Sequence, residues 1–308
     1  MKLRIFTEPQ QGASYDQLVA VAQRAEKLGF DAFFRSDHFL KMGSANGNPG
    51  PSDAWTTLAG IARETSTIRL GTLVNSATFR HPAITAVSVA NVDAMSHGRV
   101  ELGLGAGWYE DEHKAYGFSF PSLGERFEIL GEQLRIIDGL WNTPLGETFS
   151  FEGSHYNIEN SPGLPKPVQA RIPVIIGGRG KKKTPALAAQ YATEFNMPFV
   201  VIDDFVAQCS VVREACTSIG REPSTLKYTS AQTVVCGVDN AEVVRRAKNI
   251  GREVDELTQS ALCGTPDQLI AKIKQWDAAG AESVYLQILD LDDLEHLDLI
   301  ATQVLPHI

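Results

Sequence analysis

Residues 99–108, Arg-Val-Glu-Leu-Gly-Leu-Gly-Ala-Gly-Trp, decide between the two folds that this chain could adopt. They join a predicted strand, 99–104, to a glycine-rich turn that matches the first two glycines of the dinucleotide-binding motif G-x-G-x-x-G. That motif needs a third glycine at position 108 so that the helix can pack closely on the strand, and Trp108 stands there instead. The sequence therefore argues against an open nucleotide-binding sheet. It leaves two readings of the turn, a tight barrel end or a pocket for a flat ring.

Short apolar segments alternate with longer helical patterns along the rest of the chain. Strands are predicted at residues 3–6, 31–34, 68–74, 99–104, 173–176, 194–198, 228–235 and 283–288. Helices are predicted at residues 16–28, after a cap at Ser52 or Asp53, and at 82–95, 122–142, 186–191, 203–218 and 294–304. This alternation is typical of a parallel sheet. Because the nucleotide-binding motif is incomplete, eight such units predict a closed (β/α)₈ barrel of the α/β class, the TIM barrel.

The 308 residues are expected to form a single domain over 1–308, since TIM barrels run to roughly 250 residues or more. Two stretches are longer than a minimal barrel needs. Residues 143–171 are predicted to form a hairpin inserted into a βα connection, near the carboxyl-terminal face of the strands. Residues 236–265 are predicted to carry an extra helix.

The composition argues against several classes of protein. Lys and Arg number 28 and Asp and Glu number 37, which gives a net charge of −9. Such a chain lacks the basic footprint that nucleic acids and anionic membranes require. Four cysteines without a C-x-x-C pair are too few for a disulfide framework. The first ten residues contain no apolar leader segment, and no apolar run reaches the roughly 18 residues that cross a bilayer, so a cytoplasmic protein is expected.

Polar residues follow four of the predicted strands, at the ends where barrel enzymes carry their chemistry. These strand ends are 35–38, 74–82, 103–108 and 177–184. His38 is the clearest candidate for a catalytic group, because imidazole gains and loses a proton near neutral pH. The alternative is a histidine that only hydrogen-bonds its own loop. The other histidines show no metal-ligand spacing, and residues 110–113 are interpreted as the acidic first turn of a helix.

A glycine-rich turn with four cations follows the fifth predicted strand. It reads Gly177-Gly178-Arg179-Gly180-Lys181-Lys182-Lys183-Thr184. A turn of this kind before a helix presents free backbone N–H groups and the positive end of the helix dipole. A Walker A loop is excluded, since Lys182 stands where that motif needs Ser or Thr. The segment predicts a phosphate site, with a solvated run of charges as the alternative.

Taken together, these segments resemble the luciferase-like monooxygenase superfamily, and specifically its F420-dependent oxidoreductase branch. The resemblance covers nearly the whole chain. It rests on Ser36-Asp37-His38, Thr78-Phe79-Arg80-His81-Pro82, Leu104 to Trp108 with Glu112-His113, Ile176 to Thr184 with Ala188 to Ala192, and Gly264 to Leu269 with Ala279-Gly280-Ala281. Each motif is weak alone, and their common order and spacing are specific.

The resemblance implies a cofactor that lies across the carboxyl ends of the strands, coenzyme F420 or alternatively FMN, with no metal. His38 would be the proton donor or acceptor, and Asp37 would contact the ring. A non-prolyl cis peptide would lie at Leu73–Val74, with Asn75 or Ser76 touching the cofactor. The ring and ribityl side would be lined by Gly105, Ala106, Gly107 and Asp111, and the phosphate would be bound by Gly177, Gly178, Arg179, Gly180, Lys181 and Lys182. The resemblance also implies a homodimer that acts on a small molecule.

One position departs from the family pattern. Sugar-phosphate dehydrogenases of this branch have a glutamate where Trp108 aligns, as their second acid/base group, so that reaction is not expected here. Glu8, at the end of the first strand, could fill a similar space. Trp108, Tyr109 and Phe39, together with the 143–171 insertion, suggest an apolar substrate pocket.

The leading hypothesis is therefore an F420-dependent oxidoreductase that transfers hydride to or from an unidentified small molecule. An FMN-dependent monooxygenase on the same barrel is the alternative, and the cluster of four cations favours the longer anionic tail of F420. A phosphate-binding aldolase or isomerase would need a lysine or glutamate at a strand end, and no isolated lysine stands at one. A non-catalytic cofactor-binding protein is a further alternative.

Overall fold

The computed structural model describes residues 1–43 and 45–308. Eight parallel strands pair in a closed ring, in the order β1, β2, β3, β5, β8, β9, β10, β12 and back to β1. Their bounds are β1 Lys2–Thr7, β2 Ala32–Arg35, β3 Arg69–Thr72, β5 Val100–Gly105, β8 Val174–Gly177, β9 Glu194–Pro198, β10 Lys227–Cys236 and β12 Ser283–Ile288. The predicted TIM barrel is confirmed, and all eight predicted strands fall on these elements.

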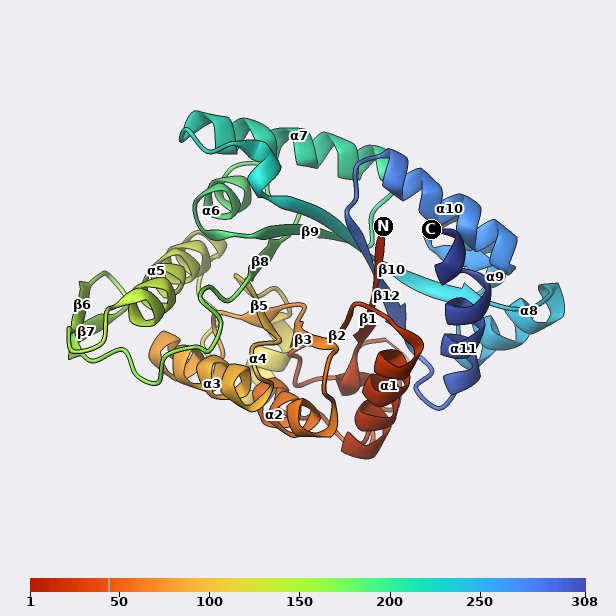
Figure 1. The fold of residues 1–308 in the computed structure, drawn as a ribbon, viewed down its shortest axis with the longest axis horizontal. Coiled ribbons are helices and arrows are strands. Elements are labelled where there is room, and N and C mark those ends of the chain that lie inside the picture. The colour runs from red at the N-terminus through yellow and green to blue at the C-terminus, as the bar shows by residue number, and fades with distance from the viewer. Residues whose placement is uncertain (44) are drawn as a thin grey trace.

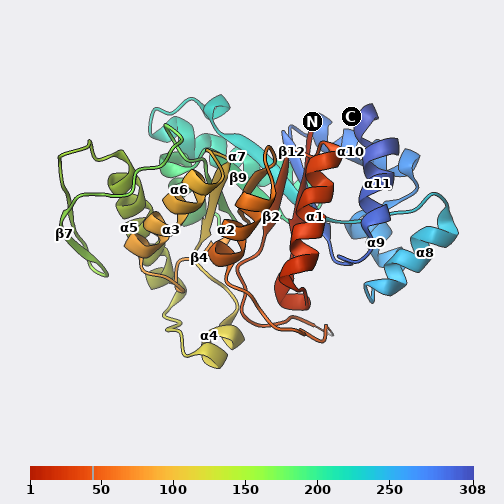
Figure 2. The ribbon, with the colours of Figure 1, turned by 60° about the horizontal axis from the view of Figure 1, so that its bottom comes forward.

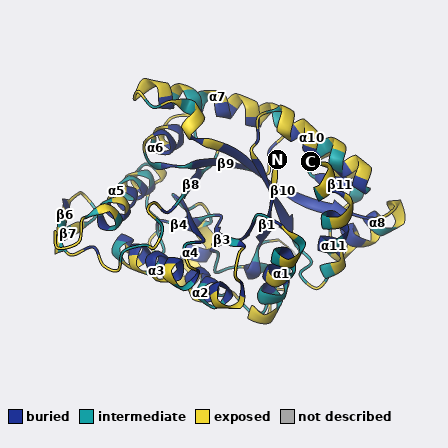
Figure 3. Ribbon diagram, viewed as in Figure 1, coloured by how far each residue is buried: buried dark blue, intermediate teal, exposed yellow. Residues whose placement is uncertain are grey.

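Helices form a ring outside the strands (Figure 1). Their bounds are α1 Tyr15–Leu28, α2 Ala54–Glu64, α3 Pro82–Met95, α4 Glu110–Tyr116, α5 Leu123–Asn142, α6 Lys183–Tyr191, α7 Ile202–Ser218, α8 Asn240–Asn249, α9 Val254–Ser260, α10 Pro266–Ala278 and α11 Leu294–Gln303. The strands are buried and the helices expose their outer sides (Figure 3), as expected for a parallel sheet covered by amphipathic helices. Among the described residues, even the longest helix is too short or too polar to span a bilayer.

Side-chain caps fix where several helices begin. Ser14 and Gln17 form a capping box at α1, and Asp53 accepts the Thr56 N–H at the start of α2. Helix α6 begins at Lys183, three residues before the predicted start. The reason is that Pro185 is tolerated in the first turn of a helix, where its missing N–H would have no helical partner.

The insertion at 143–171 has a different place from the one predicted. It forms a hairpin of β6 (Phe149–Glu152) and β7 (Asn157–Ser161), and it connects α5 to β8. It therefore belongs to an αβ connection, which begins and ends at the amino-terminal side of the barrel. Its tip folds back along α5, because the Glu132 carboxylate accepts the backbone N–H groups of residues 154–156 at 2.7–3.1 Å.

The segment 236–265 holds more than the one extra helix that was predicted. It contains α8, α9 and the short strand β11 (Leu262–Gly264), which pairs with β10. Gly251, with φ of 67°, adopts the left-handed conformation that ends α8 and allows a second helix to start. This segment follows strand β10, so it does lie in a βα connection.

His296 of α11 joins this extra segment to the barrel. Its Nε2 accepts the backbone N–H of Cys236 at 2.8 Å, and the side chain is buried. Burial, together with the nearby Arg246 guanidinium, lowers the pKa of His296 from 6.5 to about 3. The folded chain therefore holds this imidazole neutral at pH values where the unfolded chain would protonate it.

We expect the free energy of unfolding to fall as the pH drops from about 6.5 toward about 3, because the unfolded state then binds one more proton at His296 than the native state. The expected contribution is about 1.4 kcal/mol per pH unit. Urea unfolding of the wild type and of His296→Gln, compared at several pH values, measures it. An identical pH dependence in the two proteins would remove His296 as a cause.

Candidate functional site

The four segments singled out in the sequence follow four neighbouring strands, β2, β3, β5 and β8. Since the barrel is parallel, their carboxyl ends meet at one mouth. Helix α4 projects from this end of the barrel, and the chain begins at the opposite end (Figure 2). His38 and the glycine–lysine turn at 177–184 therefore lie at the same end of the molecule, as the sequence predicts.

His38 is held by a carboxylate that the sequence reasoning did not assign to the site. Its Nδ1 lies 2.9 and 3.1 Å from the two carboxylate oxygens of Glu112, and Oε2 of Glu112 also accepts the Phe39 N–H at 3.0 Å. The Glu112 side chain is only 1% exposed, whereas that of His38 is 18% exposed. The acidic first turn of α4 is present. Of its acidic residues, Glu112 is buried, while Glu110 and Asp111 are exposed.

Asp37 is buried and paired with Arg80, a second residue that the sequence reasoning did not place in the site. Its Oδ1 accepts a hydrogen bond from Arg80 at 3.0 Å, and its Oδ2 accepts bonds from Arg80 and from Asn75. Burial alone would lower the pKa of Arg80, but Asp37 and Asp53 outweigh it and raise that pKa above its ordinary value. The charge of Asp37 is thus balanced inside the protein.

The exit of β3 has the backbone form that the resemblance implies. The peptide bond between Leu73 and Val74 is cis, and it is followed by the short strand β4 (Asn75–Ser76), which pairs with β5. The buried Asn75 side chain accepts hydrogen bonds from Trp55 at 3.0 Å and from Thr72 at 2.8 Å. Its side chain is thus anchored in the protein wall.

The turn after β5 packs against this exit. Gly107 has φ of 78°, and a Cβ there would lie 2.5 Å from Ser76 Oγ. Ser76 Oγ hydrogen-bonds Thr78 Oγ1, which in turn contacts the buried His113 at 2.6 Å. Gly105 is buried and Ala106 and Gly107 are half-buried, so the floor of the mouth is made largely of backbone.

Aromatic side chains stand beside His38. Trp108 is 65% exposed, and its ring stacks on that of Tyr109 at 5.2 Å. The two rings lie 5.8 and 6.3 Å from the imidazole, nearly perpendicular to it. Phe39 packs instead in a cluster with Phe79, Tyr116 and Phe118, at ring distances of 5.1–5.7 Å.

Glu8 lies at the end of β1, on the same face as His38. Its carboxylate accepts a hydrogen bond from Gln11 at 3.4 Å. Burial raises the pKa of Glu8, an effect that the neighbouring His38 partly offsets. The mouth thus places a second titratable group close to the imidazole.

The basic turn after β8 divides its cations between two roles. Arg179 donates to the Phe199 carbonyl at 2.6 Å, and Lys183 donates to the Gly124 carbonyl at 3.0 Å. The side chains of Lys181 and Lys182 are exposed and make no hydrogen bond or ion pair within the described part of the chain. No side chain caps α6, whose first N–H groups therefore remain available. A Cβ at Gly177 would lie 2.7 Å from the Asn196 carbonyl oxygen, so this turn approaches β9 closely.

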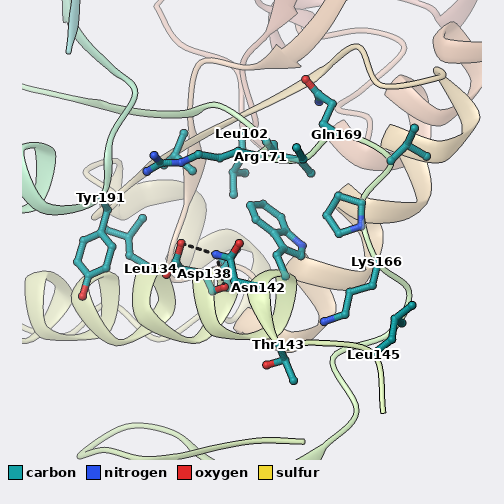
Figure 4. Close-up of a pocket in the computed structure, with 17 residues that line it drawn as sticks. Leu102, Leu134, Asp138, Asn142, Thr143, Leu145, Lys166, Gln169, Arg171 and Tyr191 are labelled. Atoms are coloured by element: carbon teal, nitrogen blue, oxygen red, sulfur yellow. Dashed lines mark hydrogen bonds between the residues drawn. The ribbon is translucent and has the colours of Figure 1, made fainter. Parts of the chain in front are cut away.

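A separate cavity of about 260 Å³ lies between the carboxyl-terminal half of α5 and the segment 166–172 (Figure 4). It is at the amino-terminal side of the barrel, away from His38. Two of its polar side chains are bonded within the protein: Lys166 donates to the Leu140 carbonyl at 2.8 Å, and Asn142 donates to Asp138 at 2.9 Å. Among residues 1–43 and 45–308, no group of three or more His, Cys, Asp or Glu side chains is arranged to hold a metal ion.

Comparison with known proteins identifies the family of this chain. A family model described as luciferase-like monooxygenase matches residues 1–257. An F420-dependent glucose-6-phosphate dehydrogenase of Amycolatopsis mediterranei is 34% identical over 164 residues, which cover 53% of this chain and 47% of that protein. One from Nakamurella multipartita is 31% identical over 242 residues, which cover 78% of this chain and 60% of that protein. The match thus spans about half the length of these curated relatives.

Solved structures share the fold at lower identity. The F420-dependent secondary alcohol dehydrogenase in complex with an F420-acetone adduct superposes with a TM-score of 0.86 at 20% identity, covering 100% of this chain and 99% of that one. The FMN complex of the oxygenating constituent of 3,6-diketocamphane monooxygenase from Pseudomonas putida gives 0.78, also at 20% identity and with the same coverage.

The family match extends from β1 into α9, so it includes the carboxyl ends of β2, β3, β5 and β8, which carry the candidate site. It confirms the resemblance that the strand-end motifs suggest. This chain belongs to the luciferase-like monooxygenase family.

Proposed function

We propose that this chain is an F420-dependent oxidoreductase that transfers a hydride between the deazaflavin and a small organic molecule. The observation that carries the proposal is the common mouth that holds both His38 and the exposed cations Lys181 and Lys182. The names of the curated relatives, F420-dependent glucose-6-phosphate dehydrogenases, support the choice of cofactor. We also propose a single domain over 1–308 that works as a homodimer in the cytoplasm.

The residues present at the mouth fit a flat cofactor with an anionic tail. Side chains at Gly107 and Gly177 would collide with Ser76 and Asn196, so only glycine lets these two turns pack this closely on the barrel wall. The uncapped start of α6, with Lys181 and Lys182 beside it, provides N–H groups, positive charge and a favourable dipole for a phosphate. The resemblance assigns the remaining contacts to Gly105, Ala106 and Asp111 on the ring side and to Gly178, Arg179 and Gly180 on the phosphate side.

When bound, a deazaflavin supplies a carbon that accepts or donates a hydride. The protein's own part is to hold the reactants and to move the proton. His38 would exchange that proton through Nε2, because its Nδ1 is engaged by Glu112. Trp108 and Tyr109 would cover the reacting centre and reduce its contact with water. Lys181, Lys182 and the start of α6 would hold the anionic tail.

The substrate is expected to differ from that of the named relatives. Trp108 stands where the sugar-phosphate dehydrogenases have their second carboxylate. Its exposed indole adds apolar surface to the mouth. We therefore propose a substrate more apolar than a sugar phosphate, with Glu8 as the nearest candidate for a second proton carrier.

A second candidate function is an FMN-dependent monooxygenase, because one solved structure with the same fold is a monooxygenase component in complex with FMN. A Schiff-base aldolase or isomerase is less well supported. The lysines within the barrel strands, Lys2 and Lys227, stand at the amino ends of β1 and β10, away from the mouth.

Titrating the purified protein with F420 and with FMN, followed by tryptophan fluorescence, separates the two cofactors. We expect F420 to bind more tightly than FMN, because its longer anionic tail can use both Lys181 and Lys182. The double variant Lys181→Gln/Lys182→Gln should weaken F420 binding and reduce its dependence on salt concentration.

Lys27→Gln is the matched control, since it removes an exposed lysine from the last turn of α1, which leads into β2 and so lies at the amino-terminal side of the barrel. It should leave the binding of both cofactors unchanged. Micromolar binding of FMN with no binding of F420 would overturn the proposed cofactor and favour the monooxygenase.

A further inference from the structure

We infer that Glu112 is a positioning residue that fixes the neutral imidazole of His38 in the Nδ1–H tautomer and leaves Nε2 as a proton acceptor. The catalytic meaning of this inference rests on the proposed function. The tautomer itself does not, since it follows from contacts within this chain.

The geometry of the contact favours donation from His38 to Glu112. Nδ1 lies between the two carboxylate oxygens, at 2.9 and 3.1 Å, so both oxygens face the same ring nitrogen. The Phe39 N–H donates to Oε2 at 3.0 Å. An ionised carboxylate can only accept hydrogen bonds, so a neutral imidazole in this position carries its proton on Nδ1.

The other ring nitrogen is left for the substrate. Within the described part of the chain, Nε2 of His38 makes no hydrogen bond. In the Nδ1–H tautomer this nitrogen presents a lone pair, so the resting imidazole takes up a proton and does not release one. The imidazolium that results is stabilised by a charge-assisted bond to Glu112.

The carboxylate is itself held in place and has no competing cation. Glu112 is buried in the first turn of α4, and within residues 1–43 and 45–308 its only ion-pair partner is His38. Asp37, the residue before His38, is neutralised by Arg80, and Glu8 approaches from the end of β1. Of these acidic groups, Glu112 is the one that is hydrogen-bonded to the imidazole.

This arrangement specifies the direction in which His38 moves the proton. A substrate that gives up a hydride from carbon and a proton from oxygen forms a C=O bond with the electron pair of its O–H bond, while the proton moves to Nε2 of His38. The hydride goes to the oxidised deazaflavin of the proposed function. Glu112 touches none of the reacting atoms and acts only through the imidazole.

The tautomer can be read from long-range ¹H–¹⁵N correlation spectra of protein labelled with ¹⁵N-histidine, without any cofactor or substrate. The His38 signals are assigned as those missing from His38→Asn. We expect a protonated Nδ1 and an unprotonated Nε2 in the neutral ring. A neutral ring protonated at Nε2 would overturn the inference.

The variant Glu112→Gln tests whether Glu112 fixes the tautomer of His38. Its amide can donate to Nδ1 as well as accept from it, so we expect the Nδ1–H pattern to be lost and both nitrogens to move toward averaged or reversed shifts. Glu132→Gln is the matched control, because Glu132 also clamps backbone N–H groups but lies in α5 at the hairpin. It should leave the His38 spectrum unchanged. Retention of the wild-type pattern in Glu112→Gln would overturn the positioning role.

The two proposals fail separately. If the wild type shows the Nδ1–H tautomer but does not bind F420, the proposed function falls and the inference about Glu112 stands. If F420 binds while the ring is protonated at Nε2, the proposed cofactor stands and Glu112 loses its role.

Discussion

His38→Ala is expected to lower turnover by at least tenfold, and on the order of 10²–10⁴-fold if the imidazole carries the full proton transfer. The affinity for F420 should stay nearly intact, because the proposed anchors of the cofactor lie after β5 and β8. The rate is measured as reduction of F420 with the hydride donor that a screen identifies, and the affinity by fluorescence titration. A loss of turnover without a loss of affinity is the signature of a group that acts in the transition state.

His38→Asn is the matched variant for this experiment. Alanine leaves the buried Glu112 carboxylate without its partner, and the variant protein could be destabilised for that reason. Asparagine places an amide nitrogen near the position of Nδ1 and can still donate to Glu112, but it has no nitrogen at the position of Nε2. Turnover should fall in both variants, and His38→Asn should keep more of the free energy of unfolding than His38→Ala. Unchanged turnover in His38→Asn would remove His38 from the mechanism.

Arg4→Met is expected to destabilise the fold by about 3–5 kcal/mol. Arg4 lies at the amino end of β1, inside the barrel, and is 2% exposed. Its guanidinium contacts Glu101 at 2.9 Å, Glu194 at 3.3 Å and the Tyr285 hydroxyl at 2.7 Å. Burial raises the pKa of Glu194, an effect that Arg4 opposes. Without Arg4, the buried Glu194 carboxylate would lose its cation, and among the described residues Glu101 would keep only its ion pair with Arg69.

Urea unfolding near neutral pH measures this effect, and Lys2→Met serves as its control. Lys2 lies on the same strand as Arg4 and forms an ion pair with Asp31, but its side chain is 57% exposed. Its removal should therefore change the free energy of unfolding by only about 0–1 kcal/mol. A change of similar size in both variants would mean that the buried cluster is no more important to stability than an exposed ion pair.

The strands could be predicted from the sequence because each is buried on both faces. Val174, Ile175 and Ile176 are apolar at consecutive positions, which is typical of a strand in a parallel sheet. The helix starts followed from capping residues such as Asp53. The segment 236–265 was harder to predict, because only four residues, 250–253, separate α8 from α9, and α9 has just seven residues with Leu257 as its one buried side chain.

The loops of the site could also be predicted, but the partners that orient their side chains could not. Glu112 stands in an acidic helical turn, and nothing local distinguishes it from its exposed neighbour Asp111. Its partner His38 is 74 residues away in the chain. Arg80 pairs with Asp37 across 43 residues. Such contacts depend on how the barrel closes, which a single sequence does not specify residue by residue.

A crystal structure of the protein with F420 tests the central claim most directly. We expect the deazaflavin ring at the mouth, with its reactive carbon facing the side of His38 that carries Nε2. The phosphate should lie at the start of α6, beside Lys181 and Lys182. A cofactor bound elsewhere, or one with its tail directed away from the turn at 177–184, would contradict it.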